Sequence, residues 1–489
     1  MSGTSRAPAS AGEMMGHPKG LFLLFGTELW ERFSYYTMRA LLVLYLVDKV
    51  RAEGGFGLGW DNPTALQLYG IFTGAVYITP LIGGWLADNF LGQRRAIIIG
   101  GFLMAAGQFM IATPHPWIEG MELAFFYAGL VLLVAGNGLF KPNISTMVGD
   151  LYPQGDHRRD GAFTIFYMGI NIGAALAGIA AAAVVAAFDG NRQVGFFCAG
   201  LGMVLSLAIQ MIWAKKLLGE IGVEPGAKRS KRENAAQNAG REPLTKQERD
   251  RIKVIMIMGL FTVVFWVGFE QAGGLMTLYT ENFTDRTIGS FEVPTELFQS
   301  LNPIFIVIFA PIIAALWIKM GDKEPNSPVK FGCGLFLLAL GFVFMIGASM
   351  QIDGGDAKAS MLWIVAAYLC HTLGELCLSP IGLSMVTKLA PLRLASLMMG
   401  VWFFFNAVSN YTAAFVGSLI GHGDEAQQME NAFAIFGGIT ITAVISGIIL
   451  MLVSNRLIDW MHGAEGPAQH EETFQEALVE ELETRPDAT

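Results

Sequence analysis

Several charged side chains lie in one strongly apolar stretch near the start of the chain. They are Glu28, Glu31, Arg32 and Arg39, and Tyr35 shares their spacing. Steps of three, four, seven and eleven residues from Glu28 place all five side chains on one face of an α-helix. Carboxylates beside an arginine can exchange a proton when a competing ligand changes their pairing. The pattern predicts a proton-binding face that looks into the protein.

Three more ionisable residues, Lys141, Glu270 and Glu375, fall in other apolar stretches. A charge near the centre of a bilayer costs about 2.5–3.5 kcal/mol on insertion scales, so such residues mark functional sites. The cations of these stretches all lie in the first half of the chain, whereas the second half contributes Glu270 and Glu375. A zwitterion whose carboxylate faces the first half and whose amine faces the second half complements this arrangement.

Other ligands and other classes of protein fit the residues less well. Nitrate alone leaves the two glutamates without a role, and a neutral sugar leaves both sets of charges without one. The motifs HExxH, GxSxG and GxxxxGK[ST] are absent from the sequence, which argues against a membrane-embedded enzyme and against ATP as the energy source. A passive channel remains an alternative. It would show no uphill accumulation of the substrate, whereas a carrier would.

The elements that must position these charges are transmembrane helices. The 489 residues are 53% hydrophobic and only 15% charged, with a mean hydropathy of +0.47. Apolar windows of roughly 20 residues, enough to cross about 30 Å of hydrocarbon, alternate with short polar stretches. Twelve windows are predicted, near 21–47, 65–88, 96–113, 123–148, 161–188, 195–217, 254–280, 299–319, 331–350, 361–387, 396–421 and 432–456.

The distribution of basic residues predicts the orientation of the chain. Residues 1–20 lack the apolar core of a cleavable signal peptide, so the first window is expected to be a retained helix. Most Lys and Arg lie in the termini and in alternate loops, which the positive-inside rule assigns to the cytoplasm. The predicted segments are a cytoplasmic tail at 1–20, a six-helix bundle at 21–217, a cytoplasmic linker at 218–252, a second bundle at 253–458 and a cytoplasmic acidic tail at 459–489.

The two halves repeat each other. Pro142, Met147, Val148, Leu151 and Pro153 recur 238 positions later as Pro380, Met385, Val386, Leu389 and Pro391. Parallel six-helix repeats are typical of transporters that rock two halves about a midplane site. The loop GGWLADNFLGQRR resembles the loop motif of the major facilitator superfamily, with Gly84, Asp88, Gly92, Arg94 and Arg95 in the matching places. The expected fold is an all-α membrane protein of that superfamily, with twelve transmembrane helices in two six-helix bundles related by pseudo-two-fold symmetry.

No metal site or nucleic-acid partner is expected. The cysteines, Cys198, Cys333, Cys370 and Cys377, all fall in apolar windows without the spacing of a metal site, and are interpreted as packing residues. A net charge of −9 would argue against a nucleic-acid partner in a soluble protein, but here it mostly reflects acidic outer loops and the acidic tail.

The segment ELWERFSYYTMR at 28–39 resembles the ExxERFxYY signature of proton-dependent oligopeptide transporters, the POT family. The segments FKPNIS at 140–145, FYMGINIGA at 166–174, NPIFIVIFAP at 302–311 and GELCLSPIGLS at 374–384 agree with the same family, as does the pair Trp266 and Glu270. The resemblance covers all twelve windows and implies a bacterial inner-membrane symporter. It would import di- and tripeptides, and accept peptide-like drugs, with protons as the coupling ion, no cofactor and no partner but the lipid bilayer, as a monomer.

The resemblance also implies roles for individual residues. The proton-coupling residues would be Glu28, Glu31, Arg32 and Glu375. The peptide-binding residues would be Tyr35, Arg39, Tyr77, Lys141, Tyr167, Asn171, Trp266, Glu270, Asn302, Glu375 and Trp402. Among them Arg39 and Lys141 would receive the peptide carboxylate. Lys141 and Glu375 would form a salt bridge that helps to close the inner gate.

The sequence departs from the family in two places. The linker at 218–252 is too polar to hold the extra helix pair of many bacterial members. The histidine that animal members carry on the second helix aligns with Gly70, so proton coupling must lie elsewhere. His371 precedes Glu375 by four residues and is expected on its face of the helix. We therefore hypothesise that His371 modulates the proton affinity of Glu375. The alternative is a histidine that is hydrogen-bonded to a neighbouring helix.

Overall fold

The structure is a computed structural model that describes residues 12–114, 117–152, 158–225, 244–352, 358–391 and 394–464. Most of the predicted linker and most of both predicted tails lie outside these residues. The helices are α1 (Lys19–Val47), α2 (Asn62–Leu86), α3 (Gln93–Ile111), α4 (Glu122–Asp150), α5 (Arg158–Ala187), α6 (Arg192–Leu218), α8 (Lys246–Phe269), α9 (Leu275–Phe283), α10 (Leu301–Met320), α11 (Ser327–Gln351), α12 (Met361–Leu389), α13 (Ala395–Ser418) and α14 (Glu425–Met461). Each predicted window coincides with one helix, except that the seventh is divided between α8 and α9.

Short elements occupy the connections between the long helices. They are the π-helical turn η3 (Ala87–Leu91) and the 3-10 segments η2 (Arg51–Glu53), η6 (Glu270–Gly273), η7 (Thr295–Ser300) and η8 (Gly321–Lys323). The strands are two residues each: β1 (Glu13–Met14) pairs with β2 (His17–Pro18), β3 (Thr284–Asp285) with β6 (Ala359–Ser360), and β4 (Thr287–Ile288) with β5 (Phe291–Glu292).

The beginnings of several helices are fixed by polar caps. A side-chain oxygen accepts a hydrogen bond from a backbone N–H of the first turn, which otherwise has no partner. The capping residues are Asp61, Asn191, Thr245, Asn326 and Asp424. The caps explain why these helices begin at the polar loop residues that precede the apolar windows.

Ten helical segments of the described chain are long and apolar enough to cross a membrane. The helix α1 is not among them, because Glu28, Glu31, Arg32 and Arg39 interrupt its apolar sequence. Its charged side chains are buried or half-buried by neighbouring helices, and 20 of its residues are buried. The predicted inward-facing face of this helix is therefore confirmed.

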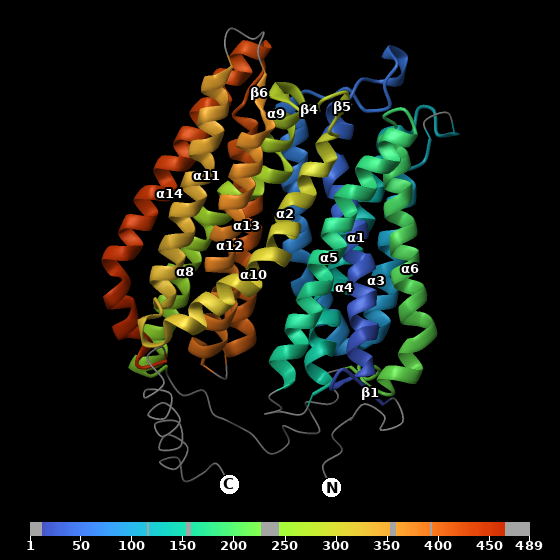
Figure 1. Ribbon diagram of the computed structural model, residues 1–489. Coiled ribbons are helices and arrows are strands. Elements are labelled where there is room, and N and C mark those ends of the chain that lie inside the picture. Colours follow the sequence, from blue (N-terminus) through green and yellow to red (C-terminus); the bar gives the residue numbers. More distant parts are fainter. Residues whose placement is uncertain are drawn as a thin grey trace, which may run out of the picture.

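The helices form two bundles (Figure 1), which we call the N-terminal bundle (α1 to α6) and the C-terminal bundle (α8 to α14). Within the first, α1 packs on α5 and α6, and α3 packs on α4; within the second, α11 packs on α12 and α14. Small residues allow these approaches, as expected in lipid. A Cβ built on Gly100 of α3 would lie 2.5 Å from the carbonyl oxygen of Gly136 in α4.

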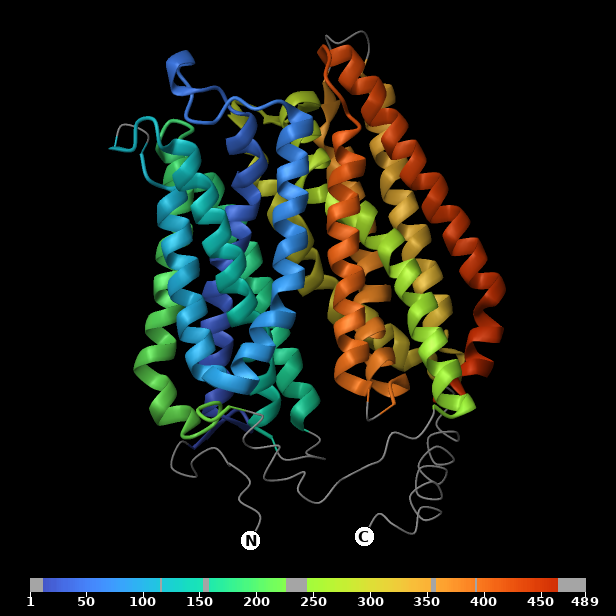
Figure 2. The same cartoon turned by 180° about the vertical axis from the view of Figure 1, so that it is seen from behind.

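The bundles meet mainly along α2 with α13 and along α5 with α10 and η7. A Cβ on Gly70 of α2 would lie 1.8 Å from the Cβ of Ala414 in α13, so the two backbones touch at this point. We call the end at which α1 ends and α2 begins the distal end, and the opposite end the proximal end. In both views the bundles lean together at the distal end and diverge toward the proximal end (Figures 1 and 2).

Candidate functional site

A buried triad of charges lies on α1. The guanidinium of Arg32 donates hydrogen bonds to both carboxylate oxygens of Glu31, and its Nη2 lies 2.7 Å from Glu31 Oε1. Its Nε lies 3.1 Å from Glu28 Oε1. All three side chains are at most 4% exposed. Two carboxylates thus share one cation, and Oε2 of Glu28 is buried without a hydrogen-bond partner in the described part of the chain.

The close approach of α5 holds this triad in place. A Cβ on Gly173 of α5 would lie 2.3 Å from the carbonyl oxygen of Leu29 and 3.2 Å from Cβ of Arg32. A side chain at Gly173 would therefore clash with α1, and α5 comes this close to the triad because residue 173 is glycine.

Lys141 projects from α4 beside α2. Its Nζ lies 4.6 Å from the centre of the Tyr77 ring, a favourable distance for a cation above an aromatic face. It is half-buried and within electrostatic range of Glu28 and Glu31. Among the described residues, no carboxylate oxygen forms an ion pair with Lys141.

Arg39 connects the two bundles. Its Nη2 lies 2.5 Å from Oε2 of Glu270, and its Nε donates a hydrogen bond of 2.7 Å to the hydroxyl of Tyr69 in α2. Glu270 is placed by a break in the predicted seventh helix, because α8 ends at Phe269 and Glu270 opens the 3-10 segment η6. A discontinuous helix at the site is a recurrent feature of transporters with repeated bundles.

Glu375 faces the site from α12. Nδ2 of Asn302 in α10 donates a hydrogen bond of 2.8 Å to Glu375 Oε2 and lies 3.0 Å from the hydroxyl oxygen of Thr372. Lys141 and Glu375 are not joined by an ion pair in this structure, so the gate salt bridge that the resemblance implies is not formed here.

The other predicted binding residues lie around these charges. The guanidinium carbon of Arg32 lies 5.2 Å from the ring centre of Tyr35. Asn171 donates a hydrogen bond to the carbonyl oxygen of Tyr167, one turn earlier in α5, and the Tyr167 side chain is exposed. Trp266 packs edge-on against Phe269, with ring centres 5.0 Å apart.

Two predicted residues pack inside the C-terminal bundle. Trp402 is buried against Phe331 of α11 and Gly382 of α12. The ring of His371 lies 4.7 Å from that of Phe342 in α11, and no hydrogen bond or ion pair joins it to Glu375 in the described residues. The hypothesis that His371 modulates Glu375 therefore finds no support in this geometry.

Sequence reasoning missed Tyr69 and a cluster of charges at the distal end. Arg192 of α6 lies 3.0 Å from Asp48 of its own bundle, and 3.2 Å from Glu296 and 3.9 Å from Glu281 of the other. Arg286 binds the same Glu281 at 3.5 Å. Charges in loops are ordinary, so nothing in the sequence distinguished these residues.

A second set of distal contacts joins the start of α2 to the loop before α14 and to α14 itself. The Asp61 carboxylate lies 3.1 Å from Nε2 of His422, and Asn62 donates a hydrogen bond of 2.9 Å to Gln428. Although partial burial acts to raise it, the pKa of Asp61 lies below its ordinary value, because Thr64 hydrogen bonds and His422 stabilise the carboxylate. Together with Arg39 and Arg192, these contacts close the distal end.

The chain is similar to known proteins over most of its length. Residues 94–216 and 227–434 match the family model described as the POT family. The peptide transporter YePEPT of Yersinia enterocolitica is 35% identical over 506 aligned residues, which cover 92% of this chain and 96% of that protein. The di-/tripeptide transporter of Lactococcus lactis is 33% identical, over 91% of this chain and 97% of that protein.

A solved structure gives the same result for the fold. The crystal structure of a peptide transporter POT in complex with sulfate matches with a TM-score of 0.82 and 34% identity, over 92% of this chain and 97% of that one. The predicted all-α fold of the major facilitator superfamily is confirmed by this likeness. The chain belongs to the POT family of membrane transporters.

Proposed function

We propose that this protein is a proton-coupled symporter that imports di- and tripeptides, and peptide-like drugs, across the inner membrane by alternating access. The names of the Yersinia and Lactococcus relatives support the substrate class. We further propose that it functions as a monomer with both termini in the cytoplasm, so that the distal end faces the outside and the proximal end the cytoplasm.

The observation that carries the proposal is the opposition of charge across the bundle interface. Arg39 and Lys141 come from the N-terminal bundle, and Glu270 and Glu375 come from the C-terminal bundle. A peptide carries a carboxylate at one end and an amine at the other. Its carboxylate is attracted to the first set, and its amine to Glu375 and the amide oxygen of Asn302.

The proton-binding step follows from the charge balance of α1. Glu28, Glu31 and Arg32 together carry one excess negative charge, which the nearby Lys141 balances electrostatically. A peptide carboxylate that binds Lys141 neutralises that cation, so the excess charge then favours uptake of a proton by Glu28. Peptide and proton therefore bind cooperatively, which is the condition for symport.

Alternating access depends on which ion pairs between the bundles are formed in each state. In this structure Arg39 is paired with Glu270 at the distal side, whereas Lys141 and Glu375 are apart. We assign it to a state closed to the outside. Opening outward breaks the Arg39 pair, and formation of the Lys141–Glu375 bridge closes the inner gate.

The free energy of one proton is sufficient to drive peptide accumulation. One proton that crosses 100 mV gains about 2.3 kcal/mol. Since each 1.4 kcal/mol corresponds to a tenfold ratio, one proton supports accumulation by some tens of times.

Uptake of labelled dialanine into liposomes that contain the purified protein tests the proposal. An inward proton gradient should drive uphill accumulation that a protonophore abolishes. Unlabelled trialanine should compete, whereas free alanine and nitrate should not. Competition by nitrate without competition by peptides would instead indicate a small-anion carrier, and uptake that only equalises concentrations would indicate a channel.

A further inference from the structure

Tyr69 occupies a position between the two bundles that the expected binding residues do not include. It lies on α2, is 4% exposed, and its hydroxyl accepts a hydrogen bond of 2.7 Å from Nε of Arg39. The same guanidinium pairs with Glu270 through Nη2. Arg39 is thus bound through Nε to Tyr69 of its own bundle and through Nη2 to Glu270 of the opposite bundle.

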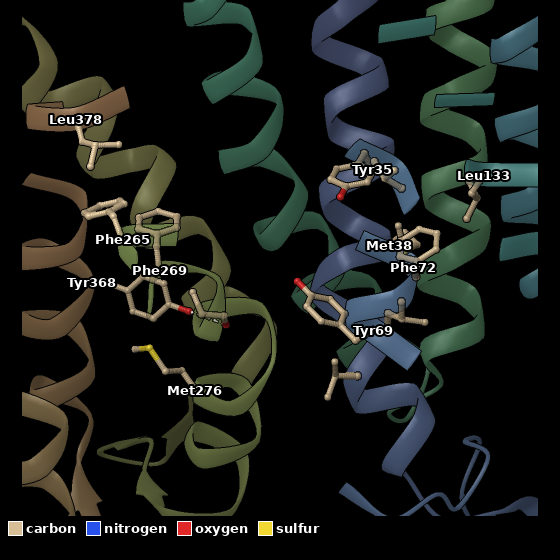
Figure 3. Close-up of a cluster of buried hydrophobic side chains, with 14 of the residues drawn as sticks. Tyr35, Met38, Tyr69, Phe72, Leu133, Phe265, Phe269, Met276, Tyr368 and Leu378 are labelled. Carbon is tan, nitrogen blue, oxygen red and sulfur yellow. Dashed lines mark hydrogen bonds between the residues drawn. The ribbon is translucent and has the colours of Figure 1, made fainter. Parts of the chain in front are cut away.

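A glycine of the C-terminal bundle makes room for this bond. A Cβ on Gly273 of η6 would lie 2.0 Å from the Tyr69 hydroxyl oxygen and 2.9 Å from Arg39 Nε. Figure 3 shows the Tyr69 hydroxyl pointing from α2 toward the C-terminal bundle. The Tyr69–Arg39 pair therefore fits a space in the other bundle that only a residue without a side chain leaves open.

The same tyrosine borders a small cavity between α2, η6 and α13. Polar residues around it are Tyr69, Glu270, Gln271 and Asn410. Gln271 is anchored by a hydrogen bond of 2.8 Å to the carbonyl oxygen of Ala413. Glu270 thus borders both the Arg39 guanidinium and this small cavity.

We propose that Tyr69 is a positioning residue that keeps Arg39 oriented for the peptide carboxylate throughout the transport cycle. Arg39 and Tyr69 belong to one bundle, so their bond persists when the bundles separate, whereas the pair with Glu270 breaks. While Tyr69 holds Nε, the Nη groups pair with Glu270 when the distal end is closed. They bind the peptide carboxylate when the distal end is open. A pre-oriented guanidinium binds a carboxylate at a lower entropic cost. The inference rests on the proposed function.

Several groups share this environment and contribute to its response to pH. They are Tyr35 and Tyr36 on α1, Tyr77 on α2, Lys141 on α4, Glu270 on η6, and Tyr368 and Glu375 on α12. Tyr69→Phe changes none of these charges. A shifted pH profile in that variant would therefore report the altered pairing of Arg39.

The test is the kinetics of dialanine uptake by Tyr69→Phe. Loss of one hydrogen bond to a charged group should raise KM about tenfold. The maximal rate should change less than KM, because the charged residues stay in place. Dialanine binding to the purified protein should weaken to the same extent. In an Arg39→Lys background, which lacks the Nε donor, Tyr69→Phe should weaken binding no further.

Tyr279→Phe is the matched control. Tyr279 is also buried, and its hydroxyl lies 3.1 Å from that of Ser349 within the C-terminal bundle. The control should keep the KM and the pH profile of the wild type. An unchanged KM and pH profile in Tyr69→Phe, with wild-type uptake intact, would overturn the inference. Absence of proton-driven dialanine uptake by the wild type would instead refute the proposed function.

Gly273→Ala tests the same contact from the opposite bundle. This test remains available if Tyr69→Phe fails to fold. The added methyl group cannot fit beside the Tyr69–Arg39 bond, so the distal end should stay open. Leu66 is buried. In a chain whose native cysteines are replaced by serine, the thiol of Leu66→Cys should then react faster with a thiol reagent added from the distal side. Unchanged labelling would contradict the interlock of Tyr69 with Gly273.

Discussion

Arg192 of α6 and Glu296 of η7 form an ion pair across the bundle interface, with Nε 3.2 Å from Oε1. Glu296 is 4% exposed on its side chain and Arg192 13%, so the pair is shielded from solvent. It lies at the distal rim, and the Arg39–Glu270 pair is a second contact of the same kind. Two separate, largely buried pairs of opposite charge thus join the bundles toward this end.

Neutralising the rim pair should favour the outward-open state. Arg192→Gln removes the cation that Asp48, Glu281 and Glu296 share, and these carboxylates then repel one another. A charged hydrogen bond contributes about 1.5–3 kcal/mol, so the ratio of open to closed molecules should rise by about tenfold or more. Labelling of a cysteine at Leu66 measures that ratio. If Leu66→Cys is labelled equally fast with Arg192→Gln and with Arg192 in place, Arg192 does not hold the distal end closed.

A methyl group on Gly70 should separate α2 from α13. Gly70→Ala places a Cβ 1.8 Å from that of Ala414, and overpacking of this kind costs about 1–3 kcal/mol. We expect a lower unfolding temperature and slower uptake. The double variant Gly70→Ala/Ala414→Gly moves the methyl group to the other helix and should restore both. Equal losses in the single and double variants would mean that the helices are not in contact there.

Asp61 should stabilise the start of α2 in a pH-dependent way. Its pKa is lowered in the folded protein, so its contribution is fully present above the ordinary aspartate value of about 3.9 and is lost as pH falls through the lower value. Asp61→Ala should cost about 0.5–2 kcal/mol at pH 7 through loss of the cap. Asp61→Asn keeps the cap and should cost less. Denaturant midpoints at pH 7 and pH 3 provide the measurement, and an Ala variant as stable as the wild type at pH 7 would exclude the cap.

His371 should act through packing. Its ring lies against Phe342 and beside Gly341 of α11, where a Cβ would come within 2.3 Å of the imidazole. His371→Leu should therefore keep the pH profile of uptake. A profile shifted along the pH axis would revive the hypothesis that this histidine modulates Glu375.

The sequence predicts the helices, and it predicts that charged side chains of α1 are buried, because both depend on one physical quantity, the cost of placing a residue in hydrocarbon. That cost identifies the apolar windows, and it singles out Glu28, Arg32 and Lys141 as residues retained for function. It also requires the charged face of α1 to turn inward.

Other features could not be predicted in this way, because they place no costly residue in an apolar window. Tyr69 is neutral, so its hydrogen bond to Arg39 follows only from the packing of α1 on α2. Arg192 and Glu296 lie at loops, where charges are expected, and only the fold brings them together. The break of the seventh helix at Glu270 replaces an apparently continuous apolar window. A sequence specifies no single conformational state, so it could not predict that Lys141 and Glu375 form no ion pair in this structure.

Glu28→Gln tests the central claim, that the excess charge of the α1 triad links the proton to the peptide. The variant carries the neutral form of the side chain permanently. It should exchange labelled dialanine across liposomes that hold unlabelled dialanine, and yet fail to accumulate it in response to a proton gradient. Accumulation driven by the gradient to the wild-type level would contradict the account.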